Sequence, residues 1–489
     1  MTSHVRASLL AAAIALATLA VGCGDDDDDE TALPRVATVL QDDAELLHRS
    51  PRRIAATLDD LRDLGVTWVR VTAGWSVIAP EPLSKTRPDF DATDPTAYPP
   101  GVWSKLDRAY EMSRQRGLRV AIDIAFWAPR GAFGRPARLP DHERDTIAAG
   151  DYADFAEAVA RRYPEAVAFT VWNEPNHNAF LLPQWERHDG SWRPSSPHRY
   201  RAMLEAAVPR IKAAAPAALA LIGSTSSIGG EQGAGPNDRM APLTFLRELA
   251  CFDERLRPLA RPECAGFKAL PGDGWSHHPY SLELAPWQTD PQPGNVRMGD
   301  LDRLTSLLER LHADGRTRND LPLYLTESGY QTSPPDPTWD VSLAEQARWL
   351  SEAERIARSQ PSLRSVSQFL HRDLPERPGP DLKTRWRDYQ SGLVFIDGRP
   401  KPAHAAFALP LVARRASAGE VGFWGLVRTG AGSRPVRVEV REPDGGWREI
   451  VSRRTRPDGT FGARATVDPA RTFRLRSGDR IGAPLKGAR

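Results

Sequence analysis

Two glutamates stand where apolar runs of this 489-residue chain come to an end. Glu174 closes the run "AVAFTVWNE", which begins at Ala166, and Glu327 lies in "PLYLTES", which begins at Pro322. A carboxylate beside a buried strand costs free energy unless it has a partner. Two carboxylates facing each other across one pocket suit the cleavage of a glycosidic bond, because one holds a proton for the departing oxygen and the other attacks the anomeric carbon. We expect apolar neighbours and the nearby negative charge to raise the pKa of Glu174.

Further polar side chains occur at the ends of two other apolar runs. Arg70 closes one run, and "HHPY" closes another, which places His278 and Tyr280 on one face because they are two residues apart in an extended segment. Arg70 and Tyr280 are candidate donors that would hold Glu327 ionised. His277 and His278 are adjacent and point to opposite faces, so they cannot bind one metal ion together, and we predict no metal site.

The elements that must position these residues follow one alternating pattern from Arg35 to Pro410. Near-continuous apolar runs are separated by amphipathic helical patterns, which is typical of a parallel sheet covered by helices. The predicted strands are "RVATVL" at 35–40, "VTWVRVT" at 66–72, "LRVAIDIAFW" at 118–127, "AVAFTVWNE" at 166–174, "LALIGST" at 219–225, "GWSHHPY" at 274–280, "PLYLTES" at 322–328 and "SVSQFLHR" at 365–372.

Helical patterns fill the segments between the predicted strands. One runs from Ser50 to Gly65, with Ser50 as N-cap and Gly65 as stop signal. Eight strand repeats over roughly 370 residues predict a (β/α)8 barrel with enlarged loops. An open doubly wound sheet is the alternative, although no Gly-rich phosphate turn follows the first strand. In a barrel the C-terminal strand ends share one mouth, so Glu174 and Glu327 would meet there.

The pattern changes after Pro410. The segment "PVRVEVREPDGGWREIVSRR" at 435–454 alternates with period two around turn residues, which predicts a small all-β, sandwich-like domain over residues 411–489. The catalytic barrel would then occupy residues 35–410. Trp424 or Trp447 could bind a glycan in the C-terminal domain, but a structural role is the simpler interpretation.

The N-terminus has the pattern of a processing segment. An apolar, Ala-rich run after Arg6 predicts a signal peptide over residues 1–22. The sequence "LAVGC" resembles the lipobox of bacterial lipoproteins, which implies that Cys23 is lipidated after cleavage. The acidic stretch 23–34 would form a solvated linker. We therefore expect an extracytoplasmic, cell-surface lipoprotein that meets the membrane only through this anchor, with plain secretion as the alternative.

Two cysteines remain, and the charge is nearly balanced. In an oxidising compartment Cys251 and Cys264 are plausible disulfide partners, with two free thiols as the alternative. The 65 Lys and Arg against 63 Asp and Glu give a net charge of +2, which offers no reason to expect a nucleic-acid or other polyanionic partner.

Three motifs at the predicted mouth resemble those of clan A of the glycoside hydrolases, in particular families five and thirty-nine. They are "WNEPN" at 172–176, "HPY" at 278–280 and "TESGY" at 326–330. The resemblance implies a retaining glycosidase, without a cofactor, that acts on an extracellular carbohydrate through O-glycosidic and most often β-linked bonds. It also implies roles for six residues: Glu174 as acid/base, Glu327 as nucleophile, Asn173 as a ligand of the sugar 2-hydroxyl, Tyr280 as a support of the nucleophile, and Arg70 and His278 as its frame.

The chain departs from that pattern at two strand ends. The segment "DIAFWAPRGA" lacks a histidine that many cellulase-like members have there, and "QFLHRD" has Phe369 and His371 where a sugar-stacking tryptophan is common. Loop tryptophans could replace the missing platform and bind substrate. They are Trp75, Trp127, Trp287 and Trp386.

Two other functions use the same residues. A surface lipoprotein with a degenerate barrel could bind glycan without cutting it, although a binder has no need of a matched acid and nucleophile. A transglycosylase would use both carboxylates and transfer the sugar to another sugar rather than to water.

Overall fold

The structure is a computed structural model that describes residues 36–130, 147–339, 341–428 and 432–489. The predicted signal peptide, Cys23 and the acidic linker lie outside the described residues, so the lipid anchor stays a prediction. Within the described ranges, we find no helix with the length and apolarity needed to cross a membrane. These ranges belong to one compact unit.

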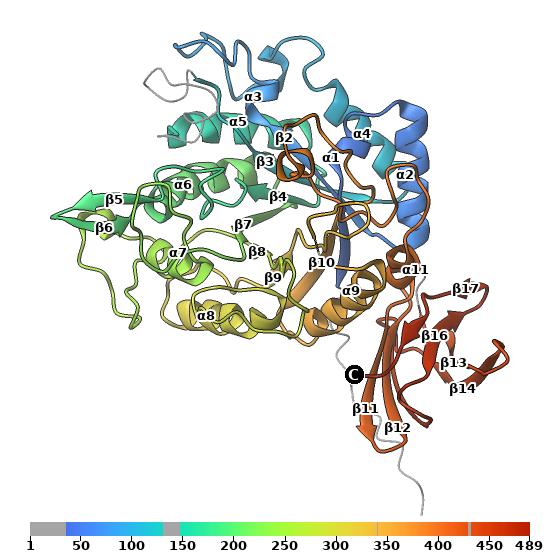
Figure 1. The fold of residues 1–489 in the computed structure, drawn as a ribbon. Coiled ribbons are helices and arrows are strands. Elements are labelled where there is room, and N and C mark those ends of the chain that lie inside the picture. Colours follow the sequence, from blue (N-terminus) through green and yellow to red (C-terminus); the bar gives the residue numbers. More distant parts are fainter. Residues whose placement is uncertain (1–35, 131–146, 340, 429–431) are drawn as a thin grey trace, which may run out of the picture. The chain divides into compact units, whose positions relative to one another are not determined.

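Eight parallel strands close into a barrel, which confirms the predicted (β/α)8 fold (Figure 1). Around the barrel the order is β1, β10, β9, β8, β7, β4, β3 and β2. The strands are β1 (Ala37–Gln41), β2 (Trp68–Gly74), β3 (Arg119–Ala125), β4 (Ala168–Val171), β7 (Leu219–Ser226), β8 (Gly274–His278), β9 (Leu323–Leu325) and β10 (Leu363–Phe369). Both β4 and β9 end before the glutamates, so Glu174 and Glu327 lie just beyond the strands and not within them.

Helices cover the outer side of the barrel, and their ends follow caps that are visible in the sequence. In α2, Ser50 Oγ accepts a hydrogen bond from the N–H of Arg53 at 3.4 Å, and Gly65 ends the helix with a left-handed φ of 85°. A capping box of Ser342 and Glu345 starts α9. The helices are α1 (Asp43–Leu46), α2 (Pro51–Leu64), α3 (Trp75–Ile78), α4 (Ser104–Arg114), α5 (Ala149–Arg162), α6 (Ser196–Ala214), α7 (Pro242–Leu249), α8 (Leu301–Ala313), α9 (Leu343–Arg358), α10 (Leu382–Arg385) and α11 (Pro402–Ala408).

The side chains inside the barrel change from apolar to polar along the strands. Near the N-terminal ends, Trp68, Ala121 and Leu221 pack in one apolar cluster. Two residues further along β2 and β3 lie Arg70 and Asp123, and both are fully buried. Because side chains two apart in a strand share a face, the same strands bring charged groups to the C-terminal mouth above an apolar floor.

The C-terminal region is all-β, as predicted. One antiparallel sheet has the order β11, β12, β15, and the other has the order β14, β13, β16, β17, with β18 paired to β16. Phe423 of the first sheet meets Phe473 of the second with ring centroids 5.2 Å apart, within one apolar core shared by both sheets. The strands are β11 (Leu411–Ser417), β12 (Glu420–Leu426), β13 (Pro435–Arg441), β14 (Trp447–Arg454), β15 (Thr460–Thr466), β16 (Thr472–Ser477), β17 (Arg480–Ile481) and β18 (Leu485–Lys486).

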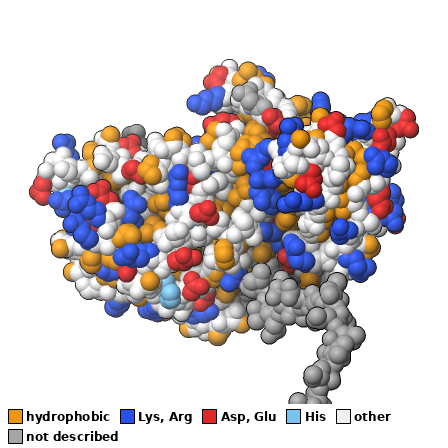
Figure 2. Space-filling model, turned by 90° about the horizontal axis from the view of Figure 1, so that it is seen from below, with side chains coloured by type: hydrophobic (Ala, Val, Ile, Leu, Met, Phe, Trp, Pro, Cys, Tyr) orange, Lys and Arg blue, Asp and Glu red, His pale blue; other side chains and the backbone are white. Residues whose placement is uncertain are grey.

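Buried polar contacts join this β region to the barrel. Arg428, which follows β12, donates hydrogen bonds to both carboxylate oxygens of Glu354 in α9, at 3.1 and 2.7 Å, and to Thr38 Oγ1 in β1 at 3.2 Å. Arg414 of β11 forms an ion pair with Glu352 at 3.0 Å. Figure 2 shows the surface from below, where Lys and Arg side chains gather at the left of the view and also toward the right, the side on which β11–β17 lie in Figure 1.

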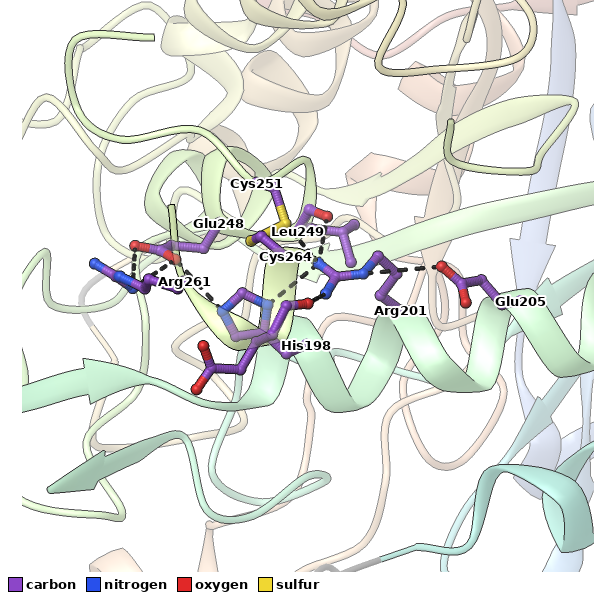
Figure 3. Close-up of a disulfide and its surroundings, with 9 residues drawn as sticks. His198, Arg201, Glu205, Glu248, Leu249, Cys251, Arg261 and Cys264 are labelled. Atoms are coloured by element: carbon purple, nitrogen blue, oxygen red, sulfur yellow. Dashed lines mark hydrogen bonds and ion pairs between the residues drawn. A yellow bond between two sulfur atoms is a disulfide. The ribbon is translucent and has the colours of Figure 1, made fainter. Parts of the chain in front are cut away.

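The loops after β4 and β7 carry two additional features. A hairpin of β5 (Trp185–His188) and β6 (Ser191–Pro194) follows β4 and was not predicted. A disulfide joins Cys251 to Cys264 beside α6 (Figure 3). Arg201 of α6 donates a hydrogen bond to the backbone oxygen of Leu249 at 3.1 Å and contacts Cys251 Sγ at 3.2 Å. The disulfide loop is thereby tied to the helix that packs against β4 and β7.

Candidate active site

The two glutamates at the strand ends meet across the mouth of the barrel. A carboxylate oxygen of Glu174, one of Glu327 and a ring nitrogen of His278 all lie within 4.8 Å of one another. The Glu174 and Glu327 side chains are 12% and 11% exposed, so each is largely enclosed yet reachable from solvent. The two carboxylates therefore face each other across one pocket, the arrangement that suits the cleavage of a glycosidic bond.

A tight turn after β4 aims Glu174 at the mouth. Trp172 and Glu174 both have positive φ angles, 65° and 42°, which end the strand and reverse the chain. The N–H of Glu174 donates to Ser224 O in β7 at 2.9 Å, and the buried Trp172 ring anchors the turn. Asn176 then donates to Met240 O at 2.9 Å and accepts from the N–H of Ser226 at 2.8 Å. The motif "WNEPN" therefore fixes the position of the carboxylate as well as supplying it.

Glu327 is held by two donors that the sequence singled out. Arg70 Nη1 donates to Glu327 Oε1 at 2.5 Å, and the Tyr280 hydroxyl donates to Oε2 at 3.2 Å. Arg70 also lies 3.4 Å from Asn173 Oδ1, which fixes the amide so that its NH2 group turns away from the guanidinium. Burial, and then the charge of Glu327, raise the pKa of Tyr280, so its hydroxyl stays a donor.

Asp123 is a buried partner of Arg70 that the sequence reasoning missed. Its Oδ1 lies 2.7 Å from Arg70 Nη2 and accepts a hydrogen bond from Thr170 Oγ1 at 2.5 Å. Burial raises the pKa of Asp123 to about 6, against the lowering effect of the Arg70 charge. The sequence does mark Asp123 as unusual, because an aspartate in the middle of "VAIDIAF" is a charge within an otherwise apolar strand.

The expected rise in the pKa of Glu174 is wrong for the site without substrate. Burial does raise the pKa of this carboxyl, but the hydrogen bond and charge of His278, followed by the charges of His177 and Arg70, lower it by more, so the net direction is downward. His278 Nδ1 lies 3.0 Å from Glu174 Oε1 and 3.8 Å from Glu327 Oε2. The prediction counted apolar neighbours and overlooked the histidine that "HHPY" places against Glu174.

The two neighbouring histidines face opposite ways, as the strand geometry requires. His277 Nε2 donates to Val296 O at 2.9 Å and Nδ1 accepts from Thr225 Oγ1 at 2.8 Å, outside the mouth. Burial lowers the pKa of His277 to about 3, so it stays neutral. Two groups of described residues are close enough to hold a cation. In one, His198 lies beside Cys251 and Cys264, which form the disulfide. In the other, Glu174, His278 and Glu327 come together, and the Arg70 guanidinium already places a positive charge on Glu327.

Side chains from loops after β9 and β10 wall the pocket above these groups. They include Trp339 and Tyr389, while Arg239 and His177 line the edge near Glu174. Tyr389 is 41% exposed, and its ring packs edge-to-face on Phe369 with centroids 5.1 Å apart. His371 turns away, with Nε2 2.7 Å from Asp60 Oδ2. Tyr389 and Trp339 are therefore the aromatic side chains of the pocket wall, where we expected other tryptophans to form a sugar-stacking platform.

None of the four predicted tryptophan platforms lines this pocket, among the residues that the structure describes. Trp75 is 5% exposed and stacks on Phe155 in the core. Arg489 covers the Trp287 ring at 4.1 Å from its centroid. Trp127 donates its indole N–H to Ala179 O at 3.1 Å near the mouth, and Trp386 caps the short α10. Loop length and course, which decide these positions, are not encoded in periodicity.

A closed parallel barrel with a carboxylate pair and an arginine-supported glutamate at its C-terminal mouth defines a class of protein, the barrel glycoside hydrolases. The family model described as Cellulase (glycosyl hydrolase family 5) matches residues 26–359. The chain belongs to this family and is a glycosidase.

Two solved structures are similar to the chain at low sequence identity. A family 39 glycoside hydrolase from the gut symbiont Bacteroides cellulosilyticus WH2 is 14% identical with a TM-score of 0.52, over 89% of this chain and 81% of that one. The GH5_18 protein from Streptomyces cattleya, in complex with GlcNAc, is 18% identical with a TM-score of 0.46, over 76% and 79%. None of the curated proteins matches the chain. The likeness to the family 39 structure concerns the fold alone.

Proposed function

We propose that the protein is a retaining glycoside hydrolase that cleaves β-linked O-glycosidic bonds of an extracellular oligo- or polysaccharide by double displacement. The observation that carries this proposal is the approach of Glu174 and Glu327 within 4.8 Å, oxygen to oxygen. Carboxyl groups about 5–5.5 Å apart leave no room for a water between carboxylate and sugar, whereas inverting enzymes keep about 6.5–9.5 Å.

Glu327 is the nucleophile in this proposal. Arg70 and Tyr280 each donate to one of its oxygens, which holds the carboxylate in one orientation. The attacking oxygen forms a bond to the anomeric carbon while the bond from that carbon to the leaving oxygen breaks. Asn173, fixed by Arg70, turns its NH2 toward the sugar 2-hydroxyl.

Glu174 is the acid of the first step and the base of the second. Its Oε1 lies 3.0 Å from His278 Nδ1, and in the first step its carboxyl gives the leaving oxygen a proton. Substrate that enters the pocket displaces water from Glu174 and so strengthens the raising effect of burial on the pKa of this carboxyl. The protonated fraction of Glu174 therefore increases as the complex forms. In the second step Glu174 accepts a proton from the water that releases the sugar.

A panel of aryl β-glycosides with activated leaving groups tests the proposal. We expect turnover by the wild-type protein, a β-configured first product by proton NMR, and label on the Glu327 peptide after inactivation with a 2-fluoro-glycoside. Glu174→Ala should keep a fast first step with activated leaving groups and lose about 10²–10⁴-fold with poor ones. An α-configured first product, or label on Glu174, would contradict the assigned roles.

The location outside the cytoplasm is proposed from the sequence alone. The signal-like run and the lipobox-like "LAVGC" support a lipid anchor at Cys23. Labelled palmitate should be incorporated into the wild-type protein and not into Cys23→Ala. Equal labelling of both would remove Cys23 as the attachment site.

A further inference from the structure

The charge of the chain is distributed unevenly. Residues 411–489 contain 17 Lys and Arg against eight Asp and Glu, a net charge of +9, whereas residues 1–410 contain 48 against 55, a net charge of −7. The overall value of +2 hides this division. A small region with so large an excess of one sign repels itself unless its surface meets an opposite charge.

Part of this excess is gathered at one end of the second β sheet. The antiparallel register of β13 and β14 places Pro435 opposite Arg454 and Val436 opposite Arg453. Just beyond, the N–H of Thr455 donates to the backbone oxygen of Arg434 at 2.9 Å. Four arginines thus come together, and we refer to them as the arginine cluster. They are Arg434, Arg453, Arg454 and Arg456, and all four are exposed.

These four arginines differ from their neighbours in lacking a carboxylate partner. In the part of the chain that the structure describes, no Asp or Glu oxygen lies within 4.0 Å of a cluster side-chain nitrogen, whereas three arginines on nearby strands are ion-paired. Those three are Arg437 with Glu449 at 3.3 Å, Arg448 with Glu442 at 2.5 Å, and Arg464 with Glu420 at 3.7 Å.

Three of the four cluster side chains contact neutral acceptors of the residues around them. Arg454 Nη2 donates to Ser433 O at 2.7 Å, Arg456 Nε to Thr460 Oγ1 at 3.0 Å, and Arg453 Nη1 to Ser452 O at 2.9 Å. These bonds hold the guanidinium groups in place without cancelling their charge. Positioned guanidinium groups suit carboxylate or sulfate oxygens, because each offers parallel N–H donors.

We propose that the arginine cluster binds an anionic polysaccharide, one that carries carboxylate or sulfate groups, and so holds the enzyme on its substrate. The proposal rests on the glycosidase function, which makes a glycan the polyanion that this chain meets. The β region is fixed to the barrel by Arg428 and Glu354, so a polymer bound at the cluster is held at a set distance from the mouth.

The active-site pocket has a matching feature. Arg239 lines the edge near Glu174, and its Nη1 lies 3.5 Å from His177 Nε2. Within the described residues, no Asp or Glu oxygen forms an ion pair with Arg239. The adjacent Met240 N–H donates to Asn176 O at 3.0 Å, which places Arg239 beside the turn that carries the proposed acid, where the leaving part of the substrate departs. A cation at this edge favours a glycan whose leaving part is negatively charged.

Affinity electrophoresis in gels that contain one polysaccharide each tests the proposal. The probes are polygalacturonate for carboxylate, dextran sulfate for sulfate, and neutral dextran. The test variant combines Arg453→Gln, Arg454→Gln and Arg456→Gln. The control variant combines Arg437→Gln, Arg448→Gln and Arg464→Gln, which removes the same charge from ion-paired positions in the same region.

We expect retardation of the wild-type protein by at least one anionic polymer and none by dextran. The test variant should lose most of this retardation, and the slope of log affinity against log salt should decrease by about two for three lost contacts. The control variant should behave as wild type. Which anionic polymer retards more identifies the group recognised.

Several outcomes would overturn the proposal. They are equal losses in both variants, retardation by dextran alone, no retardation at all, and binding to anionic lipid vesicles or to DNA but not to either anionic polymer. Hydrolysis of a neutral aryl β-glycoside should be the same for wild type and both variants, since the cluster lies outside the pocket. If wild type binds polygalacturonate but hydrolyses no aryl glycoside, the assigned mechanism fails while the binding site stands.

Discussion

The mouth of the barrel and its junction with the β region are each built around a buried arginine and a buried glutamate. At the mouth, Arg70 lies 2.5 Å from Glu327, and at the junction Arg428 lies 2.7 Å from Glu354. Both arginine side chains are almost inaccessible, at 0% and 3%. The same pair of residue types thus serves two places in one chain.

The two carboxylates differ in how many hydrogen bonds their oxygens accept. Glu354 Oε1 accepts from Arg358 Nε at 2.6 Å and from Arg428 Nη1 at 3.1 Å, and Oε2 accepts from Arg428 Nη2 at 2.7 Å. Glu327 gives one oxygen to Arg70, while the other accepts a hydrogen bond from the Tyr280 phenol at 3.2 Å and lies 3.8 Å from His278 Nδ1. A saturated carboxylate stabilises the fold, whereas a partly saturated one keeps an oxygen for reaction.

Glu327→Gln should produce the largest change in activity. The amide keeps an oxygen for Arg70 but is no nucleophile, so kcat/KM on an aryl β-glycoside should fall by at least about 10⁴-fold. Arg70 retains Asp123 as a charged partner, so the folded state should persist, as circular dichroism can check. Retained turnover with an intact fold would remove Glu327 from the reaction.

Glu354→Gln should instead lower the stability of the fold and leave the activity unchanged. It leaves Arg428 buried without a full countercharge, which should lower the free energy of unfolding by about 3–5 kcal/mol in chemical denaturation. Glu449→Gln breaks an exposed pair with Arg437 and should cost less than about 1 kcal/mol. At denaturant concentrations below those at which they unfold, both variants should hydrolyse aryl glycosides as wild type does. A large loss of activity in folded Glu354→Gln would show that the junction influences the mouth.

The junction should also make stability depend on pH in acid. Burial raises the pKa of Glu354, but the charges and hydrogen bonds of Arg428 and Arg358 outweigh it and lower the pKa from 4.5 to about 2. A depressed folded-state pKa adds stability above the unfolded value, and this stability is lost as pH falls from about 5 toward 2, with a magnitude of about 3 kcal/mol.

Unfolding midpoints of wild type and Glu354→Gln, measured between pH 7 and pH 3, check this expectation. The gap between the two proteins should narrow as the pH falls, because protonated Glu354 resembles glutamine in charge. A gap that stays constant would assign the acid sensitivity to other carboxylates, such as Glu45, whose pKa is also lowered to about 2.

The difference between the two sites also explains what could be predicted from the sequence. The barrel and the carboxylate pair followed from strand periodicity and from charges at the ends of apolar runs, since both depend on local pattern. Arg70 and Tyr280 followed from the same rule. Arg428 did not, because its partner Glu354 lies 74 residues earlier on the face of an amphipathic helix, where a glutamate is unremarkable.

Loop courses account for the errors at the mouth. The pocket wall comes from Trp339 and Tyr389, but the sequence reasoning chose Trp75, Trp287 and others by residue type. Nothing in the local sequence separates Trp75, which packs on Phe155, from a tryptophan that lines the active-site pocket. The pKa of Glu174 was misjudged for a related reason, since the closest influence, His278, comes from a strand 104 residues away.

Tyr280→Phe should give a smaller loss of activity than Glu327→Gln and sharpen the contrast between the two carboxylates. It removes one donor from Glu327 and leaves Arg70 in place, so kcat/KM should fall by about 10- to 100-fold, the equivalent of about 1.5–3 kcal/mol for a hydrogen bond to a charged group. Tyr389→Phe is the matched control, because it removes a hydroxyl from the same pocket while keeping the ring that packs on Phe369. If both variants lost activity equally, the phenol on Glu327 would have no special part in holding the carboxylate; if only Tyr280→Phe did, the oxygen left open for reaction would depend on that single donor.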